Sequence, residues 1–508
     1  MSSNSKIQLL KEALYMKITS TEDVSALRQC LEKCERAALL SWVDEHGYDM
    51  LHNTILANNV ETEGMLFTLG LFKAPHEPKL HSYLHVAANL GNRSITAMLL
   101  QERPGDFSTK KIKFKSLKPL AEEPFASLNG TSSVTSLNVA AECGHVGCVK
   151  TILDLSSGKT RFGLDANNYL SGACSCNSPS ALRLLLKQNP ATDEVKDAVG
   201  TALKLANAEC LDVLLSCRPN LSTLFRGMNL YHVLYSYSMS FKKEWYESLP
   251  TVTSVLLKRQ NPLSTIPFRT YPLNSLIIHV SASNFGQSST YMTACMIVLL
   301  NARVDPNFNE VEYETKYEAL NIKTAFGRSA FPSSLHCLYG NVRNLIRHFD
   351  EETTSDRRFV TKATETLLRH GAEPNAIGPI EDTRLHGNAL HAFMKICISL
   401  GLDERCITTF RLLIQNGSDP NVETNGLFPL NTFVEAILVN CDTFEKLSKH
   451  DEVSITEYIS EVLATLVDSM SQRSISRSSK YQIDGKPSTS CTSCAGTKCR
   501  SIRCVWTD

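Results

Sequence analysis

Four histidines stand directly after a leucine in short segments that resemble one another: His52, His85, His336 and His391. Imidazole transfers protons and binds metals near neutral pH, so these residues are the first candidates for acid–base chemistry. Catalysis needs one histidine in a unique setting, whereas this position recurs. Asparagine, an amide that hydrogen-bonds but transfers no proton, takes the same place at Asn138, Asn274 and Asn431. The pattern therefore favours a structural role, and we predict no catalytic residue.

The second candidate for chemistry is a group of four cysteines near the C-terminus: Cys491, Cys494, Cys499 and Cys504. Four thiolates can bind zinc, and the first pair has the two-residue spacing typical of a zinc ligand pair. The second pair is more widely spaced, and no apolar residues surround it. We therefore favour free or redox-sensitive thiols over zinc and predict no metal site.

A phosphate-binding loop is suggested by Gly158-Lys159-Thr160, but Leu153 stands where the first glycine of that motif belongs. The common hydrolase, zinc-protease and dinucleotide motifs are absent from the sequence. The interval from Leu273 to Leu335 and the C-terminal tail are too small for a catalytic domain. We predict a protein that is not an enzyme and uses no cofactor.

The elements that carry these residues form a repeat. The segment 135–155 is typical of two short helices joined at Gly144, and Leu137 serves as a register mark. The interval is 33 residues from Leu51 to Leu84, and again between consecutive marks at Leu137, Leu170 and Leu203. Later marks stand at Leu230, Leu273, Leu335, Leu390 and Leu430. A helix pair this short cannot bury its apolar face alone, so the copies are expected to stack.

The repeat units end in a second recognisable segment. A hydrophobic stretch runs into Asp/Glu-Pro-Asn three times, ending at Asn307, Asn375 and Asn421. Gly371 and Gly417 stand where a helix C-terminus needs positive φ, and the following proline prevents continuation.

With this period and these segments, residues 20 to 470 resemble the ankyrin-repeat family. The resemblance implies an all-α repeat solenoid of stacked helix-turn-helix ankyrin repeats with short β-turn fingers. It also implies that the recurring histidine bonds neighbouring backbone and stabilises the turn.

Composition and spacing divide the chain into four regions. We predict an N-terminal helical cap at 1–43 and regular repeats at 44–225, with a Lys-rich insertion near 101–130. Longer, divergent repeats follow at 226–470, and 471–508 is a Ser- and Cys-rich tail with the composition of disorder. The period fails near Leu224 to Gly227, which leaves open one continuous stack or two arms.

Charge and hydropathy limit the classes of partner. Lys+Arg and Asp+Glu are both 52, and this zero net charge argues against general nucleic-acid binding. No apolar run is long enough for a signal peptide or a membrane span. The 17 cysteines are then read as reduced thiols, which indicates the cytoplasm or the nucleus.

We therefore expect a monomeric, non-enzymatic scaffold that binds an unidentified protein through the concave face and turn tips of its repeats. The alternative is a substrate-recruiting adaptor of a cullin-type ubiquitin ligase, although residues 471–508 lack a recognisable SOCS box. The candidate partner-binding residues are Asp49, Asn58, Asn89, Glu142, Asn168, Trp245 and Tyr246. For the two aromatic residues, packing along an extended helix pair is the competing interpretation.

Overall fold

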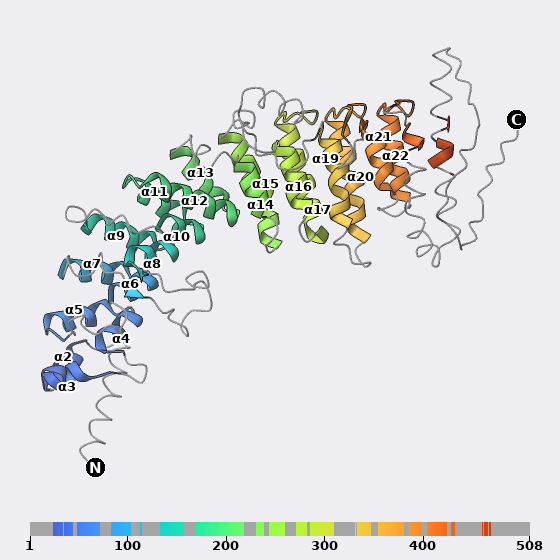
Figure 1. Cartoon of the computed structure of the whole chain (residues 1–508). Helices are drawn as coiled ribbons and strands as arrows, with labels where there is room; N and C mark the ends of the chain where they lie inside the picture. Colours follow the sequence, from blue (N-terminus) through green and yellow to red (C-terminus); the bar gives the residue numbers. More distant parts are fainter. Residues whose placement is uncertain are drawn as a thin grey trace, which may run out of the picture.

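The computed structural model describes the greater part of the repeat region (Figure 1). The described residues are 24–33, 35–43, 48–71, 83–102, 112–113, 133–156, 169–217, 230–237, 243–259, 271–281, 285–308, 331, 333–346, 354–379, 386–397, 404–423, 428–431, 460, 462–465 and 467–468. Asn168, the C-terminal cysteines and most of the Lys-rich insertion lie outside these residues.

Helices in the described residues form nine consecutive pairs, and each pair packs on the next. The first helices make one row: α4 (Met50–Leu56), α6 (Tyr83–Leu90), α8 (Ser136–Glu142), α10 (Tyr169–Ser175), α12 (Thr192–Lys204), α14 (Leu230–Ser236), α16 (Pro272–Ser281), α19 (Ser334–Ile346) and α21 (Ala389–Cys397). The second helices make the other row: α5 (Val60–Thr68), α7 (Arg93–Glu102), α9 (Val146–Ser156), α11 (Pro179–Leu186), α13 (Ala208–Cys217), α15 (Lys243–Arg259), α17 (Phe285–Asn301), α20 (Thr354–Arg369) and α22 (Glu404–Gln415). The fold is an all-α repeat solenoid, as the sequence predicts.

The core lies between the two rows and runs the length of the stack. The mark leucines from Leu51 to Leu390 are all buried, and Leu430 is partly buried against the same core. Small residues such as Ala140 and Ala141 are fully buried, which lets neighbouring first helices approach closely. At the N-terminal end, α2 (Val24–Glu32) packs on α5 and buries Leu27 and Leu31, next to α3 (Arg36–Ser41).

The turn inside each early unit contains one residue with positive φ, seven residues after the mark leucine. These residues are Asn58, Gly91, Gly144 and Asn177. In the next unit it is Ala206, so the residue equivalent to the mark is Val199. The alignment at Leu203 is therefore wrong by four residues. The sequence pattern does not distinguish the two positions, because Val199 and Leu203 are one turn apart and both lie on the buried face of α12. This helix also begins early, at Thr192.

The stack is continuous where the sequence period fails, because α13 packs on α15 and α12 packs on α14. Figure 1 shows one bent array, whose N-terminal half turns its first-helix row toward the inside of the bend. Second helices before this junction have eight to eleven residues. After it, α15 and α17 have 17, α20 has 16 and α22 has 12. Part of the extra length of the late units is thus helix.

Two short antiparallel strand pairs occur between units. Strand β1 (Ile112–Lys113), which belongs to the Lys-rich insertion, pairs with β2 (Ser133–Val134). Strand β3 (Gly378–Pro379) pairs with β4 (His386–Gly387). These pairs correspond to the short fingers expected from the repeat pattern. No helix within the described ranges has both the length and the apolar character that a membrane crossing requires.

Candidate functional site

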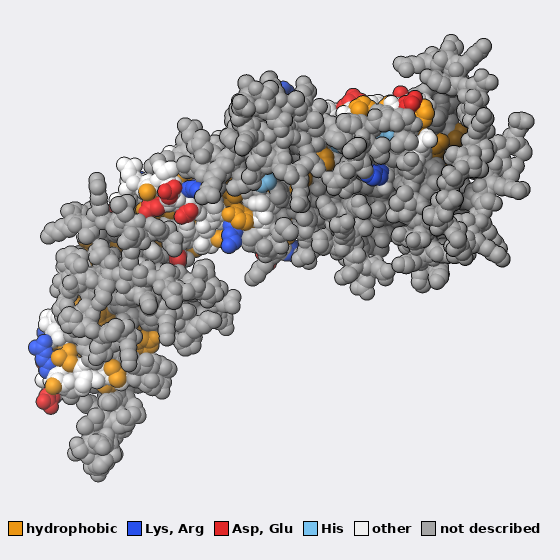
Figure 2. All heavy atoms as spheres, viewed as in Figure 1, with side chains coloured by type: hydrophobic (Ala, Val, Ile, Leu, Met, Phe, Trp, Pro, Cys, Tyr) orange, Lys and Arg blue, Asp and Glu red, His pale blue; other side chains and the backbone are white. Residues whose placement is uncertain are grey.

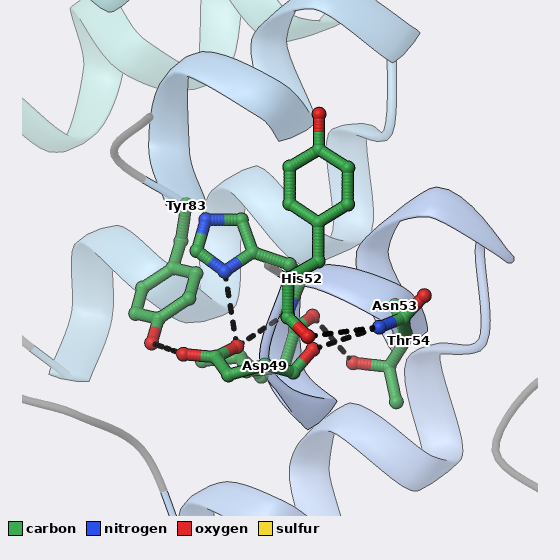
Figure 3. Close-up of polar contacts among 7 residues, drawn as sticks. Asp49, His52, Asn53, Thr54 and Tyr83 are labelled. Atoms are coloured by element: carbon green, nitrogen blue, oxygen red, sulfur yellow. Dashed lines mark hydrogen bonds and ion pairs between the residues drawn. The ribbon is translucent and has the colours of Figure 1, made fainter. Parts of the chain in front are cut away.

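A cluster of ionisable side chains joins the first two units and consists of Asp49, His52 and Tyr83 (Figure 3). Asp49 caps α4, and its Oδ1 accepts from the backbone N–H of His52 at 2.9 Å and from His52 Nδ1 at 3.0 Å. Its other oxygen, Oδ2, accepts from the hydroxyl of Tyr83, the first residue of α6, at 2.5 Å. The carboxylate thus closes one helix end and binds the next unit.

Solvent has almost no access to this cluster. The exposed fractions are 6% for Asp49, 2% for His52 and 6% for Tyr83. Burial raises the pKa of Asp49, but the hydrogen bond and charge of His52 and the hydrogen bond from Tyr83 outweigh it and hold that pKa below its usual range. The geometry therefore favours a structural connection between units over partner contact for Asp49.

The other recurring histidines are buried in the same way. In α19, His336 donates from Nε2 to the carbonyl of Gly387 in the next unit at 3.0 Å and accepts at Nδ1 from the hydroxyl of Ser333 at 2.9 Å. Burial lowers the pKa of His336 to about 4, so its imidazole is neutral near pH 7. In α21, His391 bonds the Asn388 side chain at 2.7 Å. These bonds match the structural role predicted for this position.

Three of the predicted binding residues lie at one edge of the stack. Asn58, Asn89 and Glu142 stand at or just after the C-terminal ends of α4, α6 and α8, three first helices that pack side by side. Asn58 is exposed and has positive φ, a conformation that asparagine tolerates well. Asn89 and Glu142 are half-buried. The sequence placed them in different repeats, and stacking brings them into one row.

Glu142 has a distinctive setting in this row. Burial raises the pKa of its carboxyl to about 7, so both protonation states are populated near neutral pH. Its side chain lies over Gly172 of α10, where an added Cβ would meet Glu142 Cγ at 2.5 Å. Asn89 also holds the neighbouring unit, because its backbone carbonyl lies 2.9 Å from His145 Nε2 and its Oδ1 accepts from the Cys143 thiol at 3.4 Å.

The two aromatic candidates have a different environment from this row. Trp245 and Tyr246 lie in the first turn of α15, and their exposed fractions are only 5% and 3%. Their rings meet edge to face at 5.1 Å. Both side chains pack in the core, which favours the competing interpretation given above, because α15 is long and needs large residues to cover its inner face.

The comparisons with known proteins add little to this geometry. No family model matches the sequence, and no curated protein matches it either. Among solved structures, the ankyrin repeat domain of human ASB11 is similar at 15% identity and a TM-score of 0.31, covering 58% of this chain and 100% of that chain. A likeness of this size establishes neither the family nor the function.

Sequence reasoning missed a set of asparagine side chains that join the late units. Asn307 donates from Nδ2 to the Gly371 carbonyl at 2.8 Å and accepts from the Glu373 N–H at 2.6 Å. Asn375 repeats both bonds one unit later, with Gly417 at 2.8 Å and Asp419 at 2.7 Å. The recurring Asp/Glu-Pro-Asn ending was the available signal. This ending marks helix ends in the sequence, and in the structure its asparagine also connects the units.

The described cysteines are free thiols, and most of them are buried. No group of three or more His, Cys, Asp or Glu side chains in the described part of the chain is placed to hold a metal ion. The C-terminal cysteines lie outside the described residues, so the preference for free thiols over zinc there stays a prediction.

Proposed function

We propose that this chain is a degenerate ankyrin-repeat protein that binds a protein partner and has no enzymatic activity. The observation that carries this proposal is the row formed by Asn58, Asn89 and Glu142 at one edge of α4, α6 and α8. Polar groups such as Asp49 and Asn375 hold the stack, whereas this edge carries amide and carboxyl groups that are exposed at Asn58 and half-buried at Asn89 and Glu142. Such groups set specificity at protein interfaces through hydrogen bonds.

The division of the stack into regular and longer repeats is consistent with the proposed role as a protein-binding scaffold. We place regular repeats at 44–225 and longer ones at 226–470, since the second helices lengthen at α15. A continuous stack of this kind gives an extended surface, and side chains on it can vary without disturbing the core. We place the protein in the cytoplasm or nucleus as a monomer.

The proposal is tested by photo-crosslinking in cells from positions 58, 89 and 142, with Lys150, an exposed residue of α9, as the control position. We expect one shared protein to crosslink from the three edge positions and not from position 150. The triple variant Asn58→Ala, Asn89→Ala, Glu142→Ala, probed from a neighbouring edge position, should lose it. Crosslinks from position 150 alone, or from none of the four, would overturn the proposal. Capture of elongin that depends on residues 471–508 would instead support the ligase adaptor.

A further inference from the structure

A groove of about 610 Å³ lies on the second-helix row of the stack. Three consecutive second helices, α11, α13 and α15, line it. Its charged residues are Arg183 of α11, Glu209 and Asp212 of α13, and Lys258 of α15, and its hydroxyl groups include Ser180 and Thr251. It lies at the junction where the second helices become longer.

The charges around this groove do not cancel. Arg259 of α15 donates two hydrogen bonds to Asp212, from Nε at 2.7 Å and from Nη2 at 3.1 Å, which neutralises that carboxylate. Arg183 and Lys258 form no ion pair with any side chain in the described ranges. Glu209 is the acid that remains, so the groove carries a net positive charge. Figure 2 shows mainly acidic side chains, with basic ones beside them, on the surface over α11 and α13.

The positive charges of Arg259, Lys258 and Arg183 all act on the carboxylate of Asp212. The hydrogen bond from Arg259 lowers the pKa of Asp212, and the charges of Arg259, Lys258 and Arg183 lower it further. A carboxylate is affected this way only when the positive charges lie close to it. Two helices, α11 and α15, thus place positive charges near the same carboxylate of α13.

We propose that this groove binds an acidic peptide segment of a protein partner, with carboxylates of the segment on Arg183 and Lys258. Neighbouring helix axes lie about 8–10 Å apart, so α11 and α15 are about 16–20 Å apart. An extended segment rises about 3.3 Å per residue, and five or six residues cover that span. Glu209 in the middle disfavours a uniformly anionic polymer such as nucleic acid, which carries evenly spaced phosphates.

This inference rests on the proposed function as an interaction protein, but it concerns a separate face. The probe is a fluorescein-labelled peptide of sequence EESSSEE, titrated with the full-length chain and followed by fluorescence anisotropy. We expect saturable binding that weakens with added salt. Arg183→Glu and Lys258→Glu should each weaken binding about tenfold or more, because each replaces an attraction with a repulsion.

The matched control is Lys187→Glu, which makes the same charge change at the exposed C-terminal end of α11, outside the groove lining. Binding by this variant should stay within about twofold of the parent. Arg183→Lys should retain most of the binding, which separates loss of charge from misfolding.

Three results would overturn the proposal. The first is no saturable binding of the peptide, and the second is equal weakening by the Lys187 and Arg183 variants. The third is tighter binding of single-stranded DNA of equal charge with the same sensitivity to Arg183, which would assign the groove to phosphates. If the peptide fails while crosslinks from positions 58, 89 and 142 persist, only the groove proposal is lost. If those crosslinks are lost while the peptide still binds, only the proposed binding surface at positions 58, 89 and 142 is lost.

Discussion

The hydroxyl of Tyr83 lies 2.5 Å from Oδ2 of Asp49, so the first residue of helix α6 is bound to the residue that caps helix α4 in the preceding repeat. A single carboxylate thus serves a helix end and a contact between units. Predictions for these connecting residues follow from their geometry.

Asp49→Ala should lower the free energy of unfolding by about 2 kcal/mol, because it removes a helix cap worth about 1 kcal/mol and the bond to Tyr83. Tyr83→Phe, which removes only the second bond, should cost about 1 kcal/mol. Urea unfolding of the full chain, followed by circular dichroism, measures both. If Asp49→Ala leaves stability unchanged and instead abolishes partner binding, Asp49 belongs to the binding surface after all.

Gly172→Ala should destabilise the protein by about 1–2 kcal/mol, although alanine favours helix by about 1 kcal/mol. The added Cβ would meet Glu142 Cγ at 2.5 Å and the Glu142 backbone nitrogen at 3.3 Å. In a Glu142→Ala background the side-chain clash is gone, so the same substitution should cost much less. A double-mutant cycle by urea unfolding tests this, and additive effects of the two substitutions would show that they do not interact.

Glu63 on α5 predicts a pH dependence of stability. It is fully buried, neither of its carboxylate oxygens has a hydrogen-bond partner in the described structure, and burial raises its pKa from 4.5 to about 8. The folded state then binds more protons than the unfolded state between these values. The contribution of protonated Glu63 to the free energy of unfolding is therefore full below pH 4.5 and is lost as pH rises through about 8.

Glu63→Leu should therefore flatten the fall in stability between pH 5 and 9 and should stabilise the protein most at the alkaline end. Urea unfolding at several pH values measures the slope. The control is Glu61→Gln on the same helix, an exposed position whose substitution should leave the slope unchanged. Identical slopes for the Glu63 variant and the parent would contradict the assignment.

Asn375→Ala should cost about 2 kcal/mol, because it leaves the Gly417 carbonyl and the Asp419 N–H without their bonds across units. Asn421 is the equivalent residue of the next unit, but its side chain forms no such bond with the described residues. Asn421→Ala should thus change stability by less than about 0.5 kcal/mol. Hydrogen exchange at α20 and α22 would locate the loss of stability. Equal losses for Asn375→Ala and Asn421→Ala would contradict a connecting role for Asn375.

The sequence by itself determined the repeat and its consequences for local structure. The 33-residue intervals from Leu51 to Leu84 and from Leu137 to Leu170, the buried leucines, and the positive φ of Gly144, Gly371 and Gly417 agree with the structure. Each depends on contacts within one helix pair, where side-chain spacing of three or four residues fixes which face is buried. The structural role of the recurring histidines could be predicted for the same reason, since recurrence itself excluded a unique site.

Only the tertiary structure decided which residues meet across units. Asp49 belongs to the stack and not to its surface because Tyr83, 34 residues later, covers it. Arg259 reaches Asp212 across 47 residues, and α12 shifts the register from Leu203 to Val199. These pairings depend on how far each unit is offset and rotated on its neighbour, and that geometry is set by packing of whole helices. Hydrophobic spacing along one helix carries no information about it.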